Sequence, residues 1–227
     1  MTPTRREEQR QETYEEILQT ARKQIGEQGA PNLSLRAIAR EMGMTAPALY
    51  RYFENRDALV TVLIQLAYQS LTEALVAARE AHVEESSAAQ LMAVGRAYRD
   101  WGLAHPEDYA LIFGTPIPGY EAPPENTVPL ARTSLGVLIE VLIEGQARGE
   151  FSLPETNPQL NAGFVTYAPI VATHADALHV ALRLWRMVHG HTSLELFNHF
   201  DMLLQDPAEL FELELAANLN QLTNPKK

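Results

Sequence analysis

The chain contains no cysteine, which excludes disulfide bonds and thiolate metal sites and agrees with a reducing compartment. No apolar run looks long enough to span a bilayer, and the first twelve residues are polar, unlike a secretory signal. Glycine-rich phosphate loops and nucleophile elbows are also missing. These absences predict a cytoplasmic protein that is not an enzyme, with no catalytic residues, no cofactor, no bound metal and no membrane partner.

The net charge is −11, which by itself argues against a nucleic-acid partner. Residues 1–60 carry nine basic and nine acidic side chains, whereas residues 61–227 carry nine basic and twenty acidic ones. A neutral amino-terminal segment followed by an acidic remainder is consistent with DNA binding through a few specifically positioned contacts. Basic and acidic residues alternate near the start, which indicates either a basic arm or a solvated tail. These residues are Arg5, Arg6, Glu7, Glu8, Arg10 and Glu12.

The most informative stretch runs from Leu35 to Leu59 and has the layout of a helix-turn-helix. Leu35, Ile38 and Met42 share one face of a first helix that Ser34 caps. Gly43 then supplies the left-handed conformation that reverses the chain.

A second helix follows this turn, with Thr45 as its cap and Pro47 in its first turn. Leu49 and Phe53 are four apart and hold it on the first helix, and Asn55 caps the next helix. Similar hairpins occur in many all-α proteins, where the tyrosines of this stretch would be ordinary surface residues. In a helix-turn-helix, the second helix enters the major groove of DNA.

The stretch resembles the DNA-binding head of the TetR/AcrR family of bacterial repressors. The matching residues are Ile38, Ala39, Gly43, Met44, Thr45, Leu49, Tyr50, Phe53, Asp57, Ala58 and Leu59. The resemblance implies that Thr45, Tyr50 and Tyr52 bind phosphates and that Ala46 and Pro47 face base edges. The family usually has Lys where this chain has Arg56, whose charge and fork geometry suit phosphate. The predicted DNA-binding set is Ser34, Arg36, Thr45, Ala46, Pro47, Tyr50, Arg51, Tyr52 and Arg56.

The rest of the chain also has helical periodicity. The prolines and glycines of residues 114–129 predict a loop. Helices are expected at about 7–28, 56–81, 88–104, 106–113, 128–148, 175–198 and 207–222, with a short one near 158–167. The predicted fold is therefore all-α: a helix-turn-helix head over residues 1–55, joined by a long helix to an effector-binding and dimerisation body over residues 56–227.

A second resemblance lies in the carboxy-terminal half. Residues Trp185 to Gly190, followed by Ser193 to Leu196, are similar to the Trp…His-Gly segment of one subgroup of TetR-type ligand domains. The resemblance implies that the last two long helices pair with their copies across a two-fold axis. A homodimer also follows from the head, because one helix-turn-helix reads too few bases alone.

Aromatic and histidine side chains of the body form a candidate pocket for a small-molecule effector, although a filled core explains each one as well. The candidates are Tyr98, Trp101, His105, Tyr109, Phe113, Phe164, Tyr167, Trp185 and His189. His174, Asp176 and His179 have spacing that allows metal ligands, but packing is the better explanation.

Taken together, the sequence predicts a homodimeric transcriptional repressor that leaves a palindromic double-stranded DNA operator when a small-molecule effector binds. An activator or an effector-independent regulator stays open as an alternative. So does an all-α small-molecule carrier or enzyme whose head serves as an interaction module.

Overall fold

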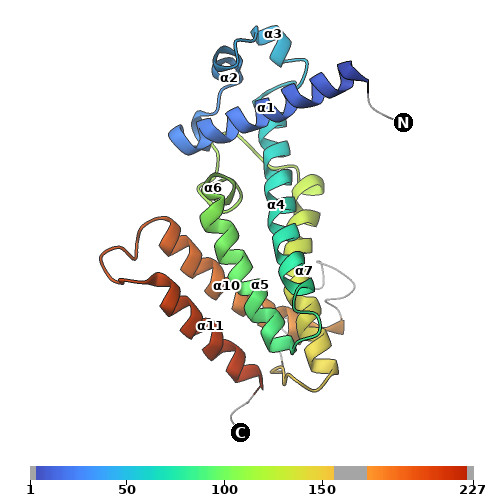
Figure 1. Ribbon diagram of the computed structural model, residues 1–227, viewed down its shortest axis with the longest axis vertical. Coiled ribbons are helices and arrows are strands. Elements are labelled where there is room, and N and C mark those ends of the chain that lie inside the picture. Colours follow the sequence, from blue (N-terminus) through green and yellow to red (C-terminus); the bar gives the residue numbers. More distant parts are fainter. Residues whose placement is uncertain (1–3, 156–172, 224–227) are drawn as a thin grey trace. The chain divides into compact units, whose positions relative to one another are not determined.

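The computed structural model describes residues 4–155 and 173–223. This part of the chain is built from helices and short connections and contains no strand, so the predicted all-α class is confirmed (Figure 1). The helices are α1 Arg5–Gln28, α2 Leu35–Glu41, α3 Ala46–Leu49, α4 Arg56–Glu80, α5 Ser87–Ala104, α6 Pro106–Phe113, α7 Pro124–Ala147, α10 Ala175–Leu196 and α11 Pro207–Thr223, with a 3-10 turn at Ala30–Asn32.

The chain forms two compact units. Unit 1 consists of Met1–Gln69 and His105–Leu130, and unit 2 of Ser70–Ala104 and Ala131–Lys227. Helices α4 and α7 therefore each contribute residues to both units. The division into a DNA-binding head at 1–55 and a body at 56–227 concerns function and stays a prediction.

Unit 1 has one hydrophobic core, to which α1, α2, α3, the first turns of α4, and α6 contribute. Ile17, Ile38, Leu49 and Leu63 are fully buried at its centre. Burying such a side chain contributes roughly 1.5–3 kcal/mol each. This core fixes the spacing of the two helix-turn-helix helices.

Helix starts in this protein are set by capping side chains. Ser34 accepts a hydrogen bond from the Ala37 N–H, Asn55 from Ala58, and Asp206 from Ala208, which confirms three predicted starts. Thr45 holds the N-cap position in an extended conformation, but its hydroxyl makes no capping hydrogen bond. That hydroxyl is therefore available to an outside partner.

Unit 2 packs α10 against α5 and α11. Gly95 of α5 lies so close to α11 that a Cβ built there would come within 2.7 Å of Leu215 Cδ2. Arg79 of α4 bonds Glu140 and Glu144 of α7, each at 2.5 Å, and holds these two helices together. Close apolar packing and charged bonds therefore both stabilise this unit.

The proline-rich connection is shorter than predicted, because α7 begins at Pro124 and includes Pro129. Pro124 takes the first helical position, where its missing N–H costs nothing. Pro129 lies five residues further on and removes one hydrogen bond, to the Glu125 carbonyl, without ending the helix. Helix α10 ends at Leu196, two residues before the predicted end, and the helix predicted near 158–167 lies outside the described residues.

Helix α4 is long and apolar enough to cross a membrane by length and composition, contrary to the expectation that no run would be. Its apolar side chains are placed in protein cores instead, where Leu59, Leu63, Leu71 and Leu75 are at most 1% exposed. The core helix of a globular domain passes the same composition test.

Candidate nucleic-acid interface

The helix-turn-helix is held by a tight turn and a small core. Gly43 has φ of +66°, the left-handed conformation that its lack of a Cβ permits at no cost. The Met44 N–H donates to the Ala39 carbonyl at 2.8 Å and closes the turn. Leu49 and Phe53 are at most 4% exposed, which confirms their predicted role of holding α3. The opposite side of α3 is left to solvent.

The predicted DNA-binding residues lie together on α2, α3 and the segment that leads into α4. Arg36, Thr45, Pro47, Tyr50 and Arg51 are exposed, and Tyr50 retains 45% of its surface. The half-buried members of the set are Ser34, Ala46, Tyr52 and Arg56. A surface of hydroxyl, phenol and guanidinium groups can donate hydrogen bonds to phosphate oxygens.

Arg56 differs from the other predicted contacts because it already has partners. Its Nη2 donates to the backbone carbonyl oxygens of Ala30 at 3.2 Å and Pro31 at 3.0 Å. Its Nε is buried without a hydrogen bond. Arg56 therefore fastens the connection between α1 and α2, a structural contact that nothing in the local sequence indicated.

The exposed arginines of this surface are not paired with acids. Arg36, Arg40 and Arg51 make no ion pair with any described residue. Glu41, which directly follows Arg40, accepts a hydrogen bond from Lys23 Nζ at 2.6 Å, and this bond lowers the pKa of Glu41. The local surface thus offers cations to an incoming polyanion although the whole chain is acidic.

Four of the candidate pocket residues belong to unit 2. Tyr98 bonds His189 Nδ1 at 2.9 Å, and Trp185 stacks on the same ring with centroids 5.0 Å apart. Burial lowers the pKa of His189, so its ring is neutral at pH 7. Trp101 donates from Nε1 to Ser70 Oγ at 3.0 Å. Tyr98 and Trp185 thus form an ordered aromatic cluster around His189, whereas Trp101 is held by Ser70.

Three other candidates, His105, Tyr109 and Phe113, belong to unit 1. Tyr109 is fully buried, and its ring packs edge-on against Phe113 with the ring centroids 5.1 Å apart. His105 is exposed at the start of α6. Phe164 and Tyr167 lie outside the described residues. The pocket assignment as a whole stays a prediction.

Two polar residues that sequence reasoning left out of the candidate pocket lie one turn apart on α10. Arg183 Nε and Nη2 and His179 Nδ1 are buried and make no hydrogen bond with the part of the chain that the structure describes. A buried donor without a partner costs about 1–3 kcal/mol, and more when it is charged. Residue type alone gives no signal for this, because the burial of α10 depends on residues distant in sequence.

A second feature missed from the sequence is a bond between α1 and α6. Arg22 Nε donates to both carboxylate oxygens of Asp108, at 2.9 and 3.2 Å, and Asp108 is 6% exposed. The partners are 86 residues apart, so no local pattern indicates the pair. It makes α6 part of the unit that carries the DNA-binding surface.

Metal ligation finds no support at the described positions. Within residues 4–155 and 173–223, no three metal-binding side chains come together. Asp176 instead accepts a hydrogen bond from Gln146 at 2.9 Å.

Two family descriptions match the chain. Residues 17–63 match the bacterial regulatory proteins of the tetR family, and residues 91–218 match the tetracyclin repressor-like carboxy-terminal domain. The HTH-type transcriptional regulator Rv1816 of Mycobacterium tuberculosis (strain ATCC 25618 / H37Rv) is 34% identical over 215 residues, which cover 92% of each chain.

Solved structures show the same likeness. The putative regulatory protein SCO4313 has 38% identity and a TM-score of 0.79 and covers 96% of this chain and 100% of its own. A Rhodococcus sp. RHA1 protein of unknown function has 25% identity and a TM-score of 0.74, with coverage of 93% and 95%. FadR from Bacillus subtilis, solved with stearoyl-CoA, has 15% identity and a TM-score of 0.65, with coverage of 94% and 100%, and shares the fold.

These matches cover both the helix-turn-helix and most of unit 2. Proteins of this kind regulate transcription rather than catalyse reactions, are typically cytoplasmic, bind DNA operators, dimerise, and are typically repressors with ligand-binding carboxy-terminal domains. The chain belongs to the TetR family of bacterial transcriptional regulators.

Proposed function

We propose that this regulator is a cytoplasmic homodimeric repressor that holds a palindromic operator through the surface of α2 and α3 and leaves it when a small-molecule effector binds. The observation that carries the proposal is the division of α3 between two sides. Leu49 is fully buried, while Thr45, Pro47 and Tyr50 are exposed next to unpaired arginines.

The exposed groups suit different parts of the operator. Thr45, Tyr50 and Tyr52 supply hydroxyl groups for backbone phosphates, which position the protein without reading bases. Ala46 and Pro47 stand at the base-facing positions and have no side-chain donor. Sequence preference therefore comes from apolar contact with thymine methyl groups and from DNA shape.

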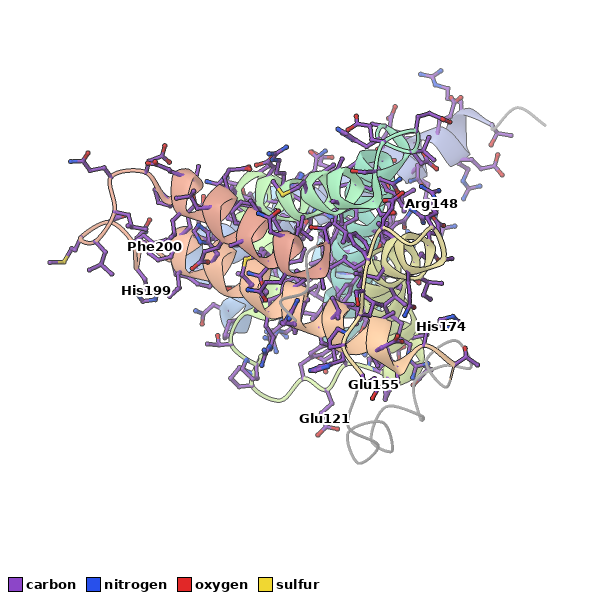
Figure 2. All side chains as sticks on the ribbon, turned by 90° about the horizontal axis from the view of Figure 1, so that it is seen from below. Glu121, Arg148, Glu155, His174, His199 and Phe200 are labelled. Carbon is purple, nitrogen blue, oxygen red and sulfur yellow. The ribbon has the colours of Figure 1, made fainter. Side chains whose placement is uncertain are left out.

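The proposed dimer contact lies on α10, α11 and the connection between them. Five of the seven exposed large hydrophobic side chains among the described residues are there: Leu194, Phe197, Met202, Leu203 and Leu213. Figure 2 shows this connection, with His199 and Phe200 labelled, projecting beyond the ends of both helices. Exposed apolar groups gathered in one place are typical of protein interfaces. A second copy of the same helices would cover them.

The last two long helices are expected to pair with their copies, and Leu194 of α10 and Leu215 of α11 have different environments there. Leu194 is 43% exposed and fits the dimer face. Leu215 is 1% exposed, because it packs against Gly95 inside the protomer. Of these two residues, only Leu194 therefore tests the dimer contact.

The effector would bind in unit 2 and favour a state with altered head spacing, because a ligand shifts an equilibrium by its differential affinity for the two states. The aromatic cluster around His189 offers apolar contact. The unpaired Arg183 and His179 favour an effector with an anionic group.

Selection of binding sites from random duplexes by the purified protein, followed by anisotropy titration, tests the operator. We expect a two-fold symmetric site and binding that weakens steeply with salt. Absence of sequence-specific binding would overturn the proposal.

Sedimentation of Leu194→Glu and Leu213→Glu tests the dimer contact, since a buried charge would separate the copies. Val83→Glu is the matched control, because Val83 is 53% exposed but lies outside the proposed contact. Variants that remain dimeric would place the interface elsewhere.

A further inference from the structure

The first turns of α1 are an ordered, capped helix that begins twelve residues before the matched tetR region. Thr4 and Glu7 form a reciprocal capping box: the Thr4 N–H donates to Glu7 Oε2 at 2.7 Å, and the Glu7 N–H donates to Thr4 Oγ1 at 3.4 Å. The segment is therefore not the solvated tail that its composition allowed. Its side chains have fixed directions.

Helical geometry separates charges that alternate in the sequence. At about 100° per residue, Arg6 and Arg10 fall on the face that continues through Tyr14 and Ile17. The opposite face carries four carboxylates, Glu8, Glu12, Glu15 and Glu16. Glu7 also falls on the face of Tyr14 and the two arginines, but its carboxylate is occupied by the capping box with Thr4. One side of this helix extension is thus basic and the other acidic.

The basic face is the face that meets the DNA-binding segment. Tyr14 stacks on Phe53 with ring centroids 5.3 Å apart, and Phe53 directly follows Tyr52. Arg10 lies one helical turn beyond Tyr14, about 6 Å along the axis, and Arg6 about 12 Å beyond it. Figure 1 shows these turns of α1 extending past α3 within unit 1.

Both guanidinium groups are exposed, and neither makes an ion pair with a described residue. A DNA backbone continues on both sides of the base pairs that a recognition helix reads. Arginine forks match phosphate oxygens in geometry and charge. The helix extension therefore carries two phosphate-binding groups next to, but outside, the helix-turn-helix.

We propose that Arg6 and Arg10 bind backbone phosphates that flank each operator half-site, and that the acidic face of the same helix turns away from the DNA. The proposal rests on the operator binding proposed above. It lengthens the stretch of DNA that the protein contacts on each side of the operator. It predicts that affinity depends on duplex length beyond the bases that α3 reads.

The test compares Arg6→Ala, Arg10→Ala and the double variant with Arg5→Ala. Arg5 is the matched control because it shares the opposite side of the helix with Gln9, Glu12 and Glu16. Operator affinity is measured between about 50 and 200 mM salt, where each phosphate contact contributes about 0.9 to the slope of log K against log salt. We expect the double variant, whose dimer lacks four of these contacts, to lose about 3.6 from the slope, and Arg5→Ala to retain the wild-type slope.

A second measurement uses two duplexes, one ending at the half-site edges and one longer by several base pairs on each side. The wild-type protein should bind the longer duplex more tightly, and the double variant should bind both alike. If the longer duplex increased the affinity of the wild type and of the double variant equally, or if both had the same slope of log K against log salt, the flanking contacts would be overturned. Operator binding itself would not be affected. A wild-type protein that binds neither duplex specifically would overturn the proposed function itself. Unchanged circular dichroism shows that α1 is retained in each variant.

Discussion

The two compact units use arginine in different ways. In unit 2, Arg79, Arg96 and Arg99 each bond a carboxylate on another helix. In unit 1, Arg36 and Arg51 lie on the surface around α3 and have no acidic partner among the described residues. The first group joins helices, and the second is left for a ligand outside the chain.

This difference explains why net charge is a poor guide to the protein's partner. The total of −11 arises after residue 60, and some of the carboxylates there are occupied by arginines of the same unit. A DNA-binding surface is set by a few unpaired cations in the right place. The pairing of each arginine, rather than the sum of charges, distinguishes the surface around α3 from the contacts that join helices, among them Arg22 with Asp108 in unit 1.

The largest effect is expected in the core of unit 2. Leu215→Ala should lower the free energy of unfolding by about 2–5 kcal/mol, because the side chain is 1% exposed and leaves a cavity beside Gly95. Gln221→Ala, on the same helix but exposed and outside the proposed dimer contact, should change it by less than about 0.5 kcal/mol. Urea denaturation measures both. Similar losses would contradict the assignment of two faces to α11.

A second pair of variants tests the comparison between arginines directly. Glu195→Ala leaves Arg99 without its 2.7 Å partner at a site where both side chains are about 15% exposed, so about 2–3 kcal/mol of stability should be lost. Arg51→Ala should leave stability within about 0.5 kcal/mol of the wild type and weaken operator binding. Thermal denaturation and anisotropy together give both readouts. A loss of stability in Arg51→Ala would contradict the distinction between arginines that join helices and arginines that are left for DNA.

A third prediction sharpens the assignment of phosphate contacts in unit 1. Tyr50→Phe should weaken binding roughly a hundredfold for all operator sequences alike, because the dimer loses two hydrogen bonds to charged phosphates, each of about 1.5 kcal/mol, and these bonds carry no base information. Arg56→Ala should weaken binding and also lower the melting temperature, because Arg56 bonds the Ala30 and Pro31 carbonyls. A change in base preference in either variant would show a different role.

The smallest effect concerns pH. Burial lowers the pKa of His191, against the opposing effect of Glu195 and Glu214, so the folded state binds its proton less readily than the unfolded chain. The stabilising contribution is then complete above the unfolded pKa of about 6.5 and is lost as the pH falls below it. The stability of His191→Asn should therefore fall less than that of the wild type between about pH 7 and pH 5.5. If the stabilities of the wild type and of His191→Asn changed with pH in parallel, His191 would not be the source of this pH dependence.

The helix-turn-helix was predictable because its signals are local. Ser34, Gly43 and Asn55 act on residues three or four positions away, and the structure confirms each of them. Leu49 and Phe53 were likewise identified from a spacing of four. Local chemistry therefore sufficed for the turn and for the core beneath α3.

What could not be predicted depends on contacts between distant segments. Arg22 and Asp108 are 86 residues apart, and Tyr98 and His189 are 91 residues apart. The occupied state of Arg56 depends on carbonyls 25 and 26 residues earlier. Proline content misplaced the start of α7, since Pro124 favours a helix start and one internal proline costs a single bond.

The close approach of α5 and α11 has a consequence for engineering this protein. Replacing Gly95 by alanine requires the buried Leu215 side chain to move, so Gly95→Ala should lower the stability of the packing between these two helices. Gly136 is also in the interior of a helix, but a Cβ there would meet nothing within 4 Å. Gly136→Ala should therefore raise the free energy of unfolding by about 0.5–1 kcal/mol, because alanine has the higher helix propensity. Two glycines that both lie inside helices therefore respond in opposite directions to the same substitution by alanine.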